Sequence, residues 1–191
     1  MKEKTCIVCG LRFLPIKPMM KVCGAPCAIK YAIDKRDKKR AQAERIAQRE
    51  DRKVVKLKLE SFKTRSDWVK EAQTAFNAYI RMRDQVAGHP CISSGRQLDW
   101  TGNAVDAGHY RSTGSAPHLR FDERNCHAQS KHDNRYLSGN AVDYRLGLIA
   151  RIGLKAVEEL EADQEPRKYS IDELKQIVAT YKLKLKELKH G

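Results

Sequence analysis

The run from Lys30 to Arg65 most limits how this chain can fold, because it has no glycine or proline and carries 14 basic against 6 acidic side chains. Its apolar side chains form only a thin stripe that includes Ala41, Ile46 and Ala47. The run therefore predicts one long helix that is solvated or docked on one side only. In a chain of 191 residues, this favours a small core with appendages over a single compact globule.

The charge balance indicates a polyanion as the partner. Lysine and arginine total 38 against 24 acids, so the formal net charge is +14. The sequence has no 18-residue apolar run, signal peptide or lipidation motif, so nucleic acid is favoured over a membrane, and a cytoplasmic location is expected. The long basic helix is then either a solvated spacer or an arm that contacts phosphates, and its composition favours neither.

Four of the six cysteines form a pattern typical of zinc sites. Cys6 and Cys9 are followed, after thirteen residues, by Cys23 and Cys27. Each pair lies on a short turn, so four thiolates can converge on one tetrahedral Zn²⁺. Structural zinc contributes about 10 to 16 kcal/mol in finger peptides, far more than the few apolar side chains of residues 1–30 can supply. The sequence therefore predicts a zinc knuckle at the N-terminus.

Helical periodicity returns after the charged run. Ser66 can cap a helix that Gly88 and Pro90 end, with an apolar face of Trp68, Ala72, Ala75, Phe76, Tyr79 and Ile80. Turn residues between short apolar pieces then predict a small hairpin region over residues 91–110.

Three helices are expected in the C-terminal part. Beyond Asn140, one helix has an apolar face of Val142, Leu146, Ile149 and Ile152, and a shorter one covers 154–162. The last starts at Ser170, which forms a capping box with Glu173, and its apolar side chains are Leu174, Ile177, Val178, Tyr181, Leu185 and Leu188.

The stretch from Asp106 to Asn134 concentrates the chemistry, because it holds four histidines, four acids and two asparagines. Phosphodiester hydrolysis at neutral pH needs a base that activates water and a divalent metal that offsets charge on the phosphate. His109 suits the base, while Asp106 and Asn134 suit a hard ion such as Mg²⁺. Asn125 could bridge backbone groups across the loop between them.

Several other side chains in this stretch have an ordinary interpretation beside a functional one. Arg111, Arg120 and Arg135 flank the proposed base and ligand, where they would bind DNA phosphates or be solvated surface residues. His118 and His127 are more often hydrogen-bonded structural residues than substrate contacts.

The order His109, Asn125, Asn134 resembles the HNH (ββα-metal) nuclease motif. More closely, "CISSGR", "DAGHYRSTGSAPHLRF", "NCHAQSKHDNRYLSGN" and "YRLGLIARIG" are similar to the phage NinG (Rap) recombination endonuclease family. The resemblance implies a metal-dependent nuclease, using Mg²⁺ or Mn²⁺, that cuts branched DNA such as Holliday junctions and D-loops. By position, His109 would be the general base, Asn134 a metal ligand and Asn125 the orienting asparagine.

Two features depart from that pattern. Many HNH motifs have an acid or histidine directly before the catalytic histidine, but Gly108 stands there, so Asp106 is the nearest substitute ligand. The motif also usually carries two cysteine pairs around a second zinc, and here those positions are Cys91, Ser94, Ser130 and Asp133. Serine hydroxyls are poor zinc ligands, so this zinc is expected to be lost, with polar contacts holding the loop. A rescue set drawn from Cys91, Cys126, His127, His132 and Asp133 is the chemical alternative.

Together these features predict a mostly helical α+β protein. Residues 1–30 would form the zinc knuckle, 31–65 a basic helical arm, 66–163 an HNH-like nuclease domain with flanking helices, and 164–191 a C-terminal helix. The candidate partners are branched DNA, a second copy of the chain and other recombination proteins. A non-catalytic module that binds branched DNA is the competing function, and a zinc-finger regulator has less support because no recognition helix can be identified.

Overall fold

The computed structural model describes residues 2–190 and divides the chain into two compact units, one ending at Phe62 and one beginning at Lys63. The predicted mostly helical α+β class is confirmed. The first unit contains β1 (Lys4–Thr5), β2 (Arg12–Phe13) and α1 (Ala25–Ser61). The second contains α2 (Arg65–Val86), β3 (Val105–His109), η1 (Pro117–Leu119), η2 (Glu123–Asn125), β4 (Cys126–Ser130), the π-helix η3 (His132–Tyr136), α3 (Ala141–Ile152), α4 (Leu154–Ala162) and α5 (Ile171–His190).

Helix α1 is the long charged helix, and it contains no buried residue. It begins five residues earlier than the charge run predicts, because Pro26 in its first turn supplies a backbone already set for a helix. It ends at Ser61 instead of Arg65, because Thr64 takes an extended conformation to cap the next helix.

The N-cap of α2 is Thr64, so the expected cap at Ser66 is wrong. Thr64 Oγ1 accepts from the backbone N–H of Asp67, and Asp67 Oδ2 accepts from the N–H of Thr64 at 3.0 Å. This reciprocal box needs an acid or amide three residues after the cap. Ser66 has Val69 at that place, whereas Thr64 has Asp67.

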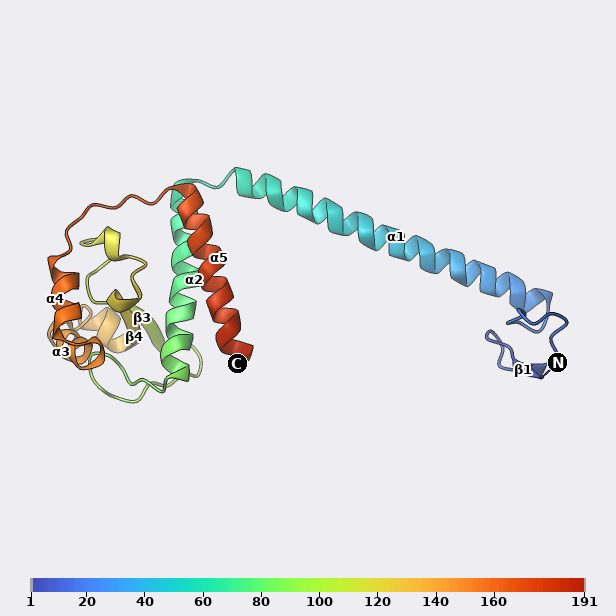
Figure 1. Cartoon of the computed structure of the whole chain (residues 1–191), viewed down its shortest axis with the longest axis horizontal. Helices are drawn as coiled ribbons and strands as arrows, with labels where there is room; N and C mark the ends of the chain where they lie inside the picture. The colour runs from blue at the N-terminus through green and yellow to red at the C-terminus, as the bar shows by residue number, and fades with distance from the viewer. Residues whose placement is uncertain (1, 191) are drawn as a thin grey trace. The chain divides into compact units, whose positions relative to one another are not determined.

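Helices α2 and α5 lie side by side and enclose the larger core of the second unit (Figure 1). The predicted apolar faces meet there, in a cluster that includes Trp68, Ala72, Phe76, Ile80, Leu174, Val178 and Tyr181. The predicted capping box of α5 is confirmed, since the Ser170 N–H donates to Glu173 at 2.8 Å and the Glu173 N–H donates to Ser170 Oγ at 3.2 Å.

Strands β3 and β4 form an antiparallel pair that packs against α2. His109 pairs with Cys126 at the loop end, and Val105 pairs with Ser130 at the other end. The hairpin therefore differs from the expected one, because its second strand lies beyond residue 110 and residues 91–104 form turns and irregular structure instead. Those turn residues still dock on the sheet, since the Ile92 N–H donates to the Ala128 carbonyl at 3.1 Å.

A second, smaller core joins α3, α4 and the segment before the hairpin. The expected α3 face is partly wrong, because Val142 and Leu146 are exposed and the buried side chains are Tyr144 and Leu148. The face that carries Tyr144 is buried because the Tyr144 hydroxyl donates to the Gly108 carbonyl at 2.8 Å. Gly147 permits the close approach, because a Cβ there would lie 1.9 Å from the Ile92 carbonyl oxygen.

A buried carboxylate connects the two cores. Asp84 is 0% exposed and lies one turn beyond Ile80 on the apolar face of α2. It accepts from Arg83 Nε at 2.7 Å and from the Ala128 N–H at 2.6 Å, and Arg151 of α3 lies 3.5 Å away. Burial alone would raise the pKa of Asp84, but the hydrogen bond and charge of Arg83 and the hydrogen bond from the Ala128 N–H lower it, so the group stays charged.

We expect Asp84→Ala to lower the free energy of unfolding of the second unit by about 3–5 kcal/mol, because it leaves two arginines without their buried counter-charge. Urea denaturation of the full chain measures this. Asp172→Ala is the matched control, since the Asp172 side chain is 89% exposed and should change stability little. Equal effects of the two substitutions would contradict the assigned role of Asp84.

Candidate active site

The sheet brings Asp106 and Asn134 together. Asp106 is the second residue of β3, and Asn134 lies in the π-helix η3 that follows β4. The Asn134 Nδ2 donates to Asp106 Oδ2 at 3.0 Å, and Arg135 Nε donates to the same oxygen at 2.9 Å. Desolvation acts to raise the pKa of Asp106, but these two hydrogen bonds and the charge of Arg135 lower it. The two proposed metal ligands are therefore neighbours.

His109 ends strand β3 and faces α2. Because side chains alternate along a strand, it points to the face opposite Asp106. Its ring lies 6.0 Å from the Phe76 ring between centroids, and its Nε2 lies 3.0 Å from the Arg120 carbonyl oxygen. A carbonyl only accepts, so Nε2 carries the hydrogen and Nδ1 is left as the acceptor, 3.7 Å from Cys126 Sγ. Desolvation lowers the pKa of His109 and favours this neutral form.

Asn125 is 0% exposed and closes the loop between the two strands. Its Oδ1 accepts from the Arg111 N–H at 2.8 Å, and its Nδ2 donates to the Arg111 and Leu119 carbonyls at 3.0 and 3.2 Å. One amide thereby uses both of its hydrogens and its oxygen on backbone groups on the two sides of the loop. This arrangement fixes the backbone directly after His109.

The glycine before His109 has a structural cause. The Gln129 side chain lies over Gly108, and a Cβ on Gly108 would be 2.1 Å from Gln129 Oε1. Gln129 is fixed because its Nε2 donates to Ser93 Oγ at 2.6 Å and to the Gly139 carbonyl at 2.7 Å. No side chain, acid or histidine, fits at position 108 without displacing this glutamine.

The four positions that correspond to a second zinc site meet around one carboxylate oxygen. Asp133 Oδ2 accepts from Cys91 Sγ at 3.2 Å, Ser94 Oγ at 2.9 Å and Ser130 Oγ at 2.6 Å. The backbone N–H groups of Asp133 and Ser130 donate to Ser130 Oγ and Cys91 Sγ, respectively. We name these four residues the Asp133 cluster. It joins the turn at residues 91–94 to the start of η3, one residue before Asn134.

The charge of Asp133 is favoured despite its burial. The residue is 6% exposed, and desolvation raises its pKa, but the hydrogen bonds from Ser130, Cys91 and Ser94 lower it. In residues 2–190, the only group of three or more histidine, cysteine or acidic side chains with converging ligand atoms is the N-terminal one. The expected polar contacts are thus present, and the rescue set does not assemble in that range.

The three candidate DNA-binding arginines all have partners within the protein. Arg111 Nη1 donates to the carbonyls of Leu160 and Asp163 at 2.9 and 2.6 Å, at the C-terminus of α4. Arg120 donates to Gln73 Oε1 and to the Thr113 carbonyl. Arg135 bonds Asp106 but keeps a side chain that is 60% exposed. Arg135 is therefore the one of the three with a guanidinium accessible to a ligand.

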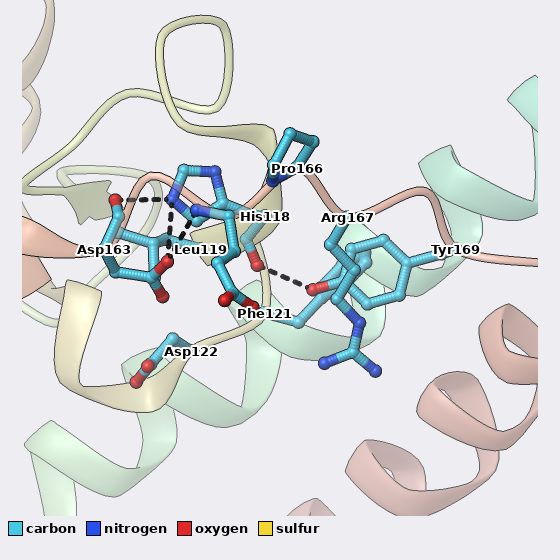
Figure 2. Close-up of a pocket in the computed structure, with 9 residues that line it drawn as sticks. His118, Leu119, Phe121, Asp122, Asp163, Pro166, Arg167 and Tyr169 are labelled. Carbon is cyan, nitrogen blue, oxygen red and sulfur yellow. Dashed lines mark hydrogen bonds and ion pairs between the residues drawn. The ribbon is translucent and has the colours of Figure 1, made fainter.

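His118 and His127 both have structural hydrogen bonds. His127 is 3% exposed and lies between Arg83, at 3.0 Å, and the Arg124 carbonyl, at 3.2 Å. His118 Nε2 contacts the Asp163 carbonyl at 2.9 Å at the edge of a pocket of about 390 Å³ (Figure 2). The Tyr169 hydroxyl closes the same region by donating to the His118 carbonyl at 2.9 Å. None of the proposed nuclease residues lines that pocket.

The N-terminal cysteines converge as their spacing predicts. The Sγ atoms of Cys6, Cys9, Cys23 and Cys27 all lie within 4.8 Å of one another. Cys6 and Cys9 flank the turn after β1, and Cys23 and Cys27 lie before and in the first turn of α1. Desolvation acts to raise the pKa of Cys6, but backbone hydrogen bonds from Cys9, Val8 and Cys23 lower it from 9.0 to about 6. Four such side chains could hold a metal such as zinc.

Sequence reasoning missed three groups that shape the site. Asp84 had a detectable signal, because it continues the four-residue spacing of Ala72, Phe76 and Ile80 on a buried face. Gln129 and Tyr144 had none, since their roles depend on contacts with Gly108, which is distant from both in sequence.

The fold and these residues define a mostly helical α+β protein with a cysteine cluster that could hold a metal and, in a separate unit, a short β-hairpin followed by a helical turn. The family model described as Bacteriophage Lambda NinG protein matches residues 1–191. The chain therefore belongs to the NinG family.

Three similar proteins are each named Protein ninG. The chain is 44% identical over 174 residues to that of Salmonella phage P22, covering 87% of this chain and 83% of the relative. It is 43% identical over 176 residues to that of Escherichia phage lambda, covering 88% and 84%, and 41% identical over 196 residues to that of Enterobacteria phage H19B, covering 99% and 95%. No solved structure matches the chain. In the part of the chain that the structure describes, no helix combines the length and apolarity that a bilayer crossing requires.

We expect Asp133→Asn to lower the free energy of unfolding by about 1.5–3 kcal/mol, because it removes the charge that three donors share. The pKa of Asp133 is lower in the folded protein, so the cluster stabilises the fold above the ordinary carboxyl pKa of about 3.9 and loses that effect as the pH falls through the folded value. Denaturation at several pH values measures both effects.

The control for this experiment is Asp143→Asn, an exposed carboxylate whose hydrogen bond is to Asn140. The stability gap between the parent and Asp133→Asn should narrow on acidification, while Asp143→Asn should differ little from the parent at any pH. An Asp133→Asn protein as stable as the parent at pH 7 would refute the role of the cluster.

Proposed function

We propose that this protein is a metal-dependent endonuclease of phage recombination that hydrolyses phosphodiesters in branched DNA, in the cytoplasm of the bacterial host. The HNH-like residues His109, Asn125 and Asn134 would be the catalytic set. The NinG family membership supports a role in phage biology, and the chemistry is inferred from the residues.

The observation that carries the proposal is the state of His109. A general base must be neutral at working pH and keep one nitrogen free to accept a proton. The bond from Nε2 to the Arg120 carbonyl fixes the tautomer, and desolvation lowers the pKa, so Nδ1 is unprotonated. Its neighbour Cys126 keeps its proton, because burial raises the pKa of that thiol, so the attacking water would have to replace the weak S–H donor that lies 3.7 Å from Nδ1.

The residues around Asp106 fit a divalent ion such as Mg²⁺ or Mn²⁺. Mg²⁺ in proteins commonly keeps several waters and is bound through one or two carboxylates together with substrate phosphates. Asp106 offers a carboxylate, and a rotation of the Asn134 amide would turn its oxygen toward the same place, since Nδ2 already lies 3.0 Å from Asp106 Oδ2. The bound ion would offset the negative charge that develops on the phosphate.

The protein's own residues would then position the reactants. Asn125 holds the loop, the Arg120 carbonyl holds the imidazole, and Nδ1 accepts the proton of the attacking water. Arg135 can exchange its bond with Asp106 for a phosphate oxygen once a cation occupies that carboxylate. Affinity would come from phosphate contacts, so the shape of the DNA and not its base sequence would guide binding.

A non-catalytic module that binds branched DNA is the second candidate. Two observations favour it: Arg135 already neutralises Asp106, and Asp106 and His109 point to opposite faces of β3. In this case the hairpin would be a folded remnant of a nuclease, and DNA binding would not require a divalent ion.

Cleavage of a four-way junction separates the two candidates. With Mg²⁺ or Mn²⁺, the parent should cut the junction in preference to linear duplex, and His109→Ala should lose about 10²- to 10⁴-fold in rate, because a positioned base contributes that much. The His109→Ala protein should still bind the junction. His190→Ala is the control, since this exposed histidine lies at the end of α5. Junction binding without cutting by the parent would select the module.

Metal analysis tests the assignment of zinc to the cysteine cluster. We expect one zinc per chain, because the cysteine thiolates form one four-ligand set and the Asp133 cluster lacks three of the four thiolates. Cys9→Ser should lower that value sharply, whereas Cys126→Ser should not. Two equivalents in the parent would mean that a second site exists.

A further inference from the structure

We propose that one face of α1 is the surface that binds nucleic acid phosphates. This face, named the basic stripe, consists of Lys38, Arg45, Arg49, Arg52 and Lys56. The inference rests on the DNA substrate of the proposed function but not on cleavage.

The spacing places these five cations on one side of the helix. They follow one another at intervals of seven, four, three and four residues, and side chains three, four or seven apart share a face of an α-helix. The stripe runs over eighteen residues, which is about 27 Å at about 1.5 Å per residue. All five residues are exposed.

Between Lys38 and Lys56 no acid of α1 lies on this face, and Asp34 and Glu60 lie one turn beyond its two ends. Asp37, Glu44 and Asp51 also repeat every seven residues, but each precedes a stripe residue by one position, which is a rotation of about 100° around the axis. They pair with cations away from the stripe where they pair at all, as in Arg36–Asp37 at 3.5 Å and Arg40–Glu44 at 3.1 Å. Over its length the stripe is therefore not interrupted by an acid, which a mere solvated spacer does not require.

Most of the stripe has no counter-charge. Within residues 2–190, Lys38, Arg45, Arg49 and Arg52 make no ion pair or side-chain hydrogen bond, and Lys56 has a weak contact with Glu60 at 3.9 Å. Like charges three or four residues apart destabilise a helix, and α1 has no buried side chain to offset this. A row of unpaired guanidinium groups is thus poised for an external polyanion.

Duplex DNA matches the stripe in charge density. It carries about one negative charge per 1.7 Å of axis, so the length of the stripe faces about sixteen phosphates. Arginine donors bind phosphate oxygens in a bidentate manner and read no base sequence from them. The expected binding is therefore salt-dependent and insensitive to sequence, which suits a protein that recognises DNA by shape.

The test compares two triple substitutions that remove the same charge. Arg45→Gln/Arg49→Gln/Arg52→Gln changes the stripe, and Arg36→Gln/Arg40→Gln/Lys58→Gln changes the rest of α1. Glutamine keeps nearly the helix propensity of arginine and lysine, and far-UV circular dichroism verifies that α1 persists. Binding of the full chain to a four-way junction and to linear duplex is measured by fluorescence anisotropy over a range of salt concentrations, without added Mg²⁺ or Mn²⁺.

We expect the stripe triple to lower the slope of log affinity against log salt by about three, since each lost phosphate contact contributes about 0.9. The control triple should lower it by less than about one. Equal losses in both would overturn the proposal, because net charge and not the stripe would then govern binding. Binding of the parent and of both triples to phosphatidylserine vesicles is measured in parallel. A stripe triple that loses vesicle binding but binds DNA as the parent does would also overturn the proposal.

The outcome is independent of catalysis. A parent that binds the junction through the stripe but never cuts it would support this inference while refuting the nuclease. A parent that cuts the junction with an unchanged salt slope in the stripe triple would do the reverse.

Discussion

The buried amide of Asn125 is the interaction on which the candidate site depends. It ties the backbone after His109 to the Leu119 carbonyl, and the next residue along, Arg120, supplies the carbonyl that orients the imidazole. Hydrogen bonds inside a protein are costly to leave unmade, so this amide fixes the loop more firmly than any one surface contact could. The tautomer of His109 follows from it.

The protein holds its two turn regions by different chemistry. At the N-terminus, four thiols converge and could hold a metal such as zinc. Beside the hairpin, the carboxylate of Asp133 gathers three donors in the same kind of four-position arrangement. Such a hydrogen-bond network needs no ion. The two hydrophobic cores of the second unit also stabilise this region. The start of η3, and with it Asn134, can be held without a second zinc.

Local features of the fold could be predicted from the sequence, and distant ones could not. Three features depend on residues only a few positions apart: the bounds of α4, the Ser170 capping box and the apolar face of α2. Periodicity and capping rules therefore predicted them. The burial of Tyr144 depends on its hydrogen bond to the Gly108 carbonyl, and the need for glycine at position 108 depends on Gln129. Both partners are distant in sequence. In the site, the order of His109, Asn125 and Asn134 was readable, whereas the bond between Arg135 and Asp106 was not, because nothing local specifies it.

The proposed nuclease requires that a divalent ion, held by Asp106 and Asn134, and a neutral His109 act on the same phosphate. Paramagnetic broadening by Mn²⁺ in NMR spectra of the His109→Ala protein bound to a four-way junction tests this most directly. We expect selective broadening of the amide signals of Asp106, Asn134 and their neighbours, and we expect an added Asp106→Ala substitution to abolish it. Uniform spectra on addition of Mn²⁺, or broadening centred elsewhere in the second unit, would contradict it.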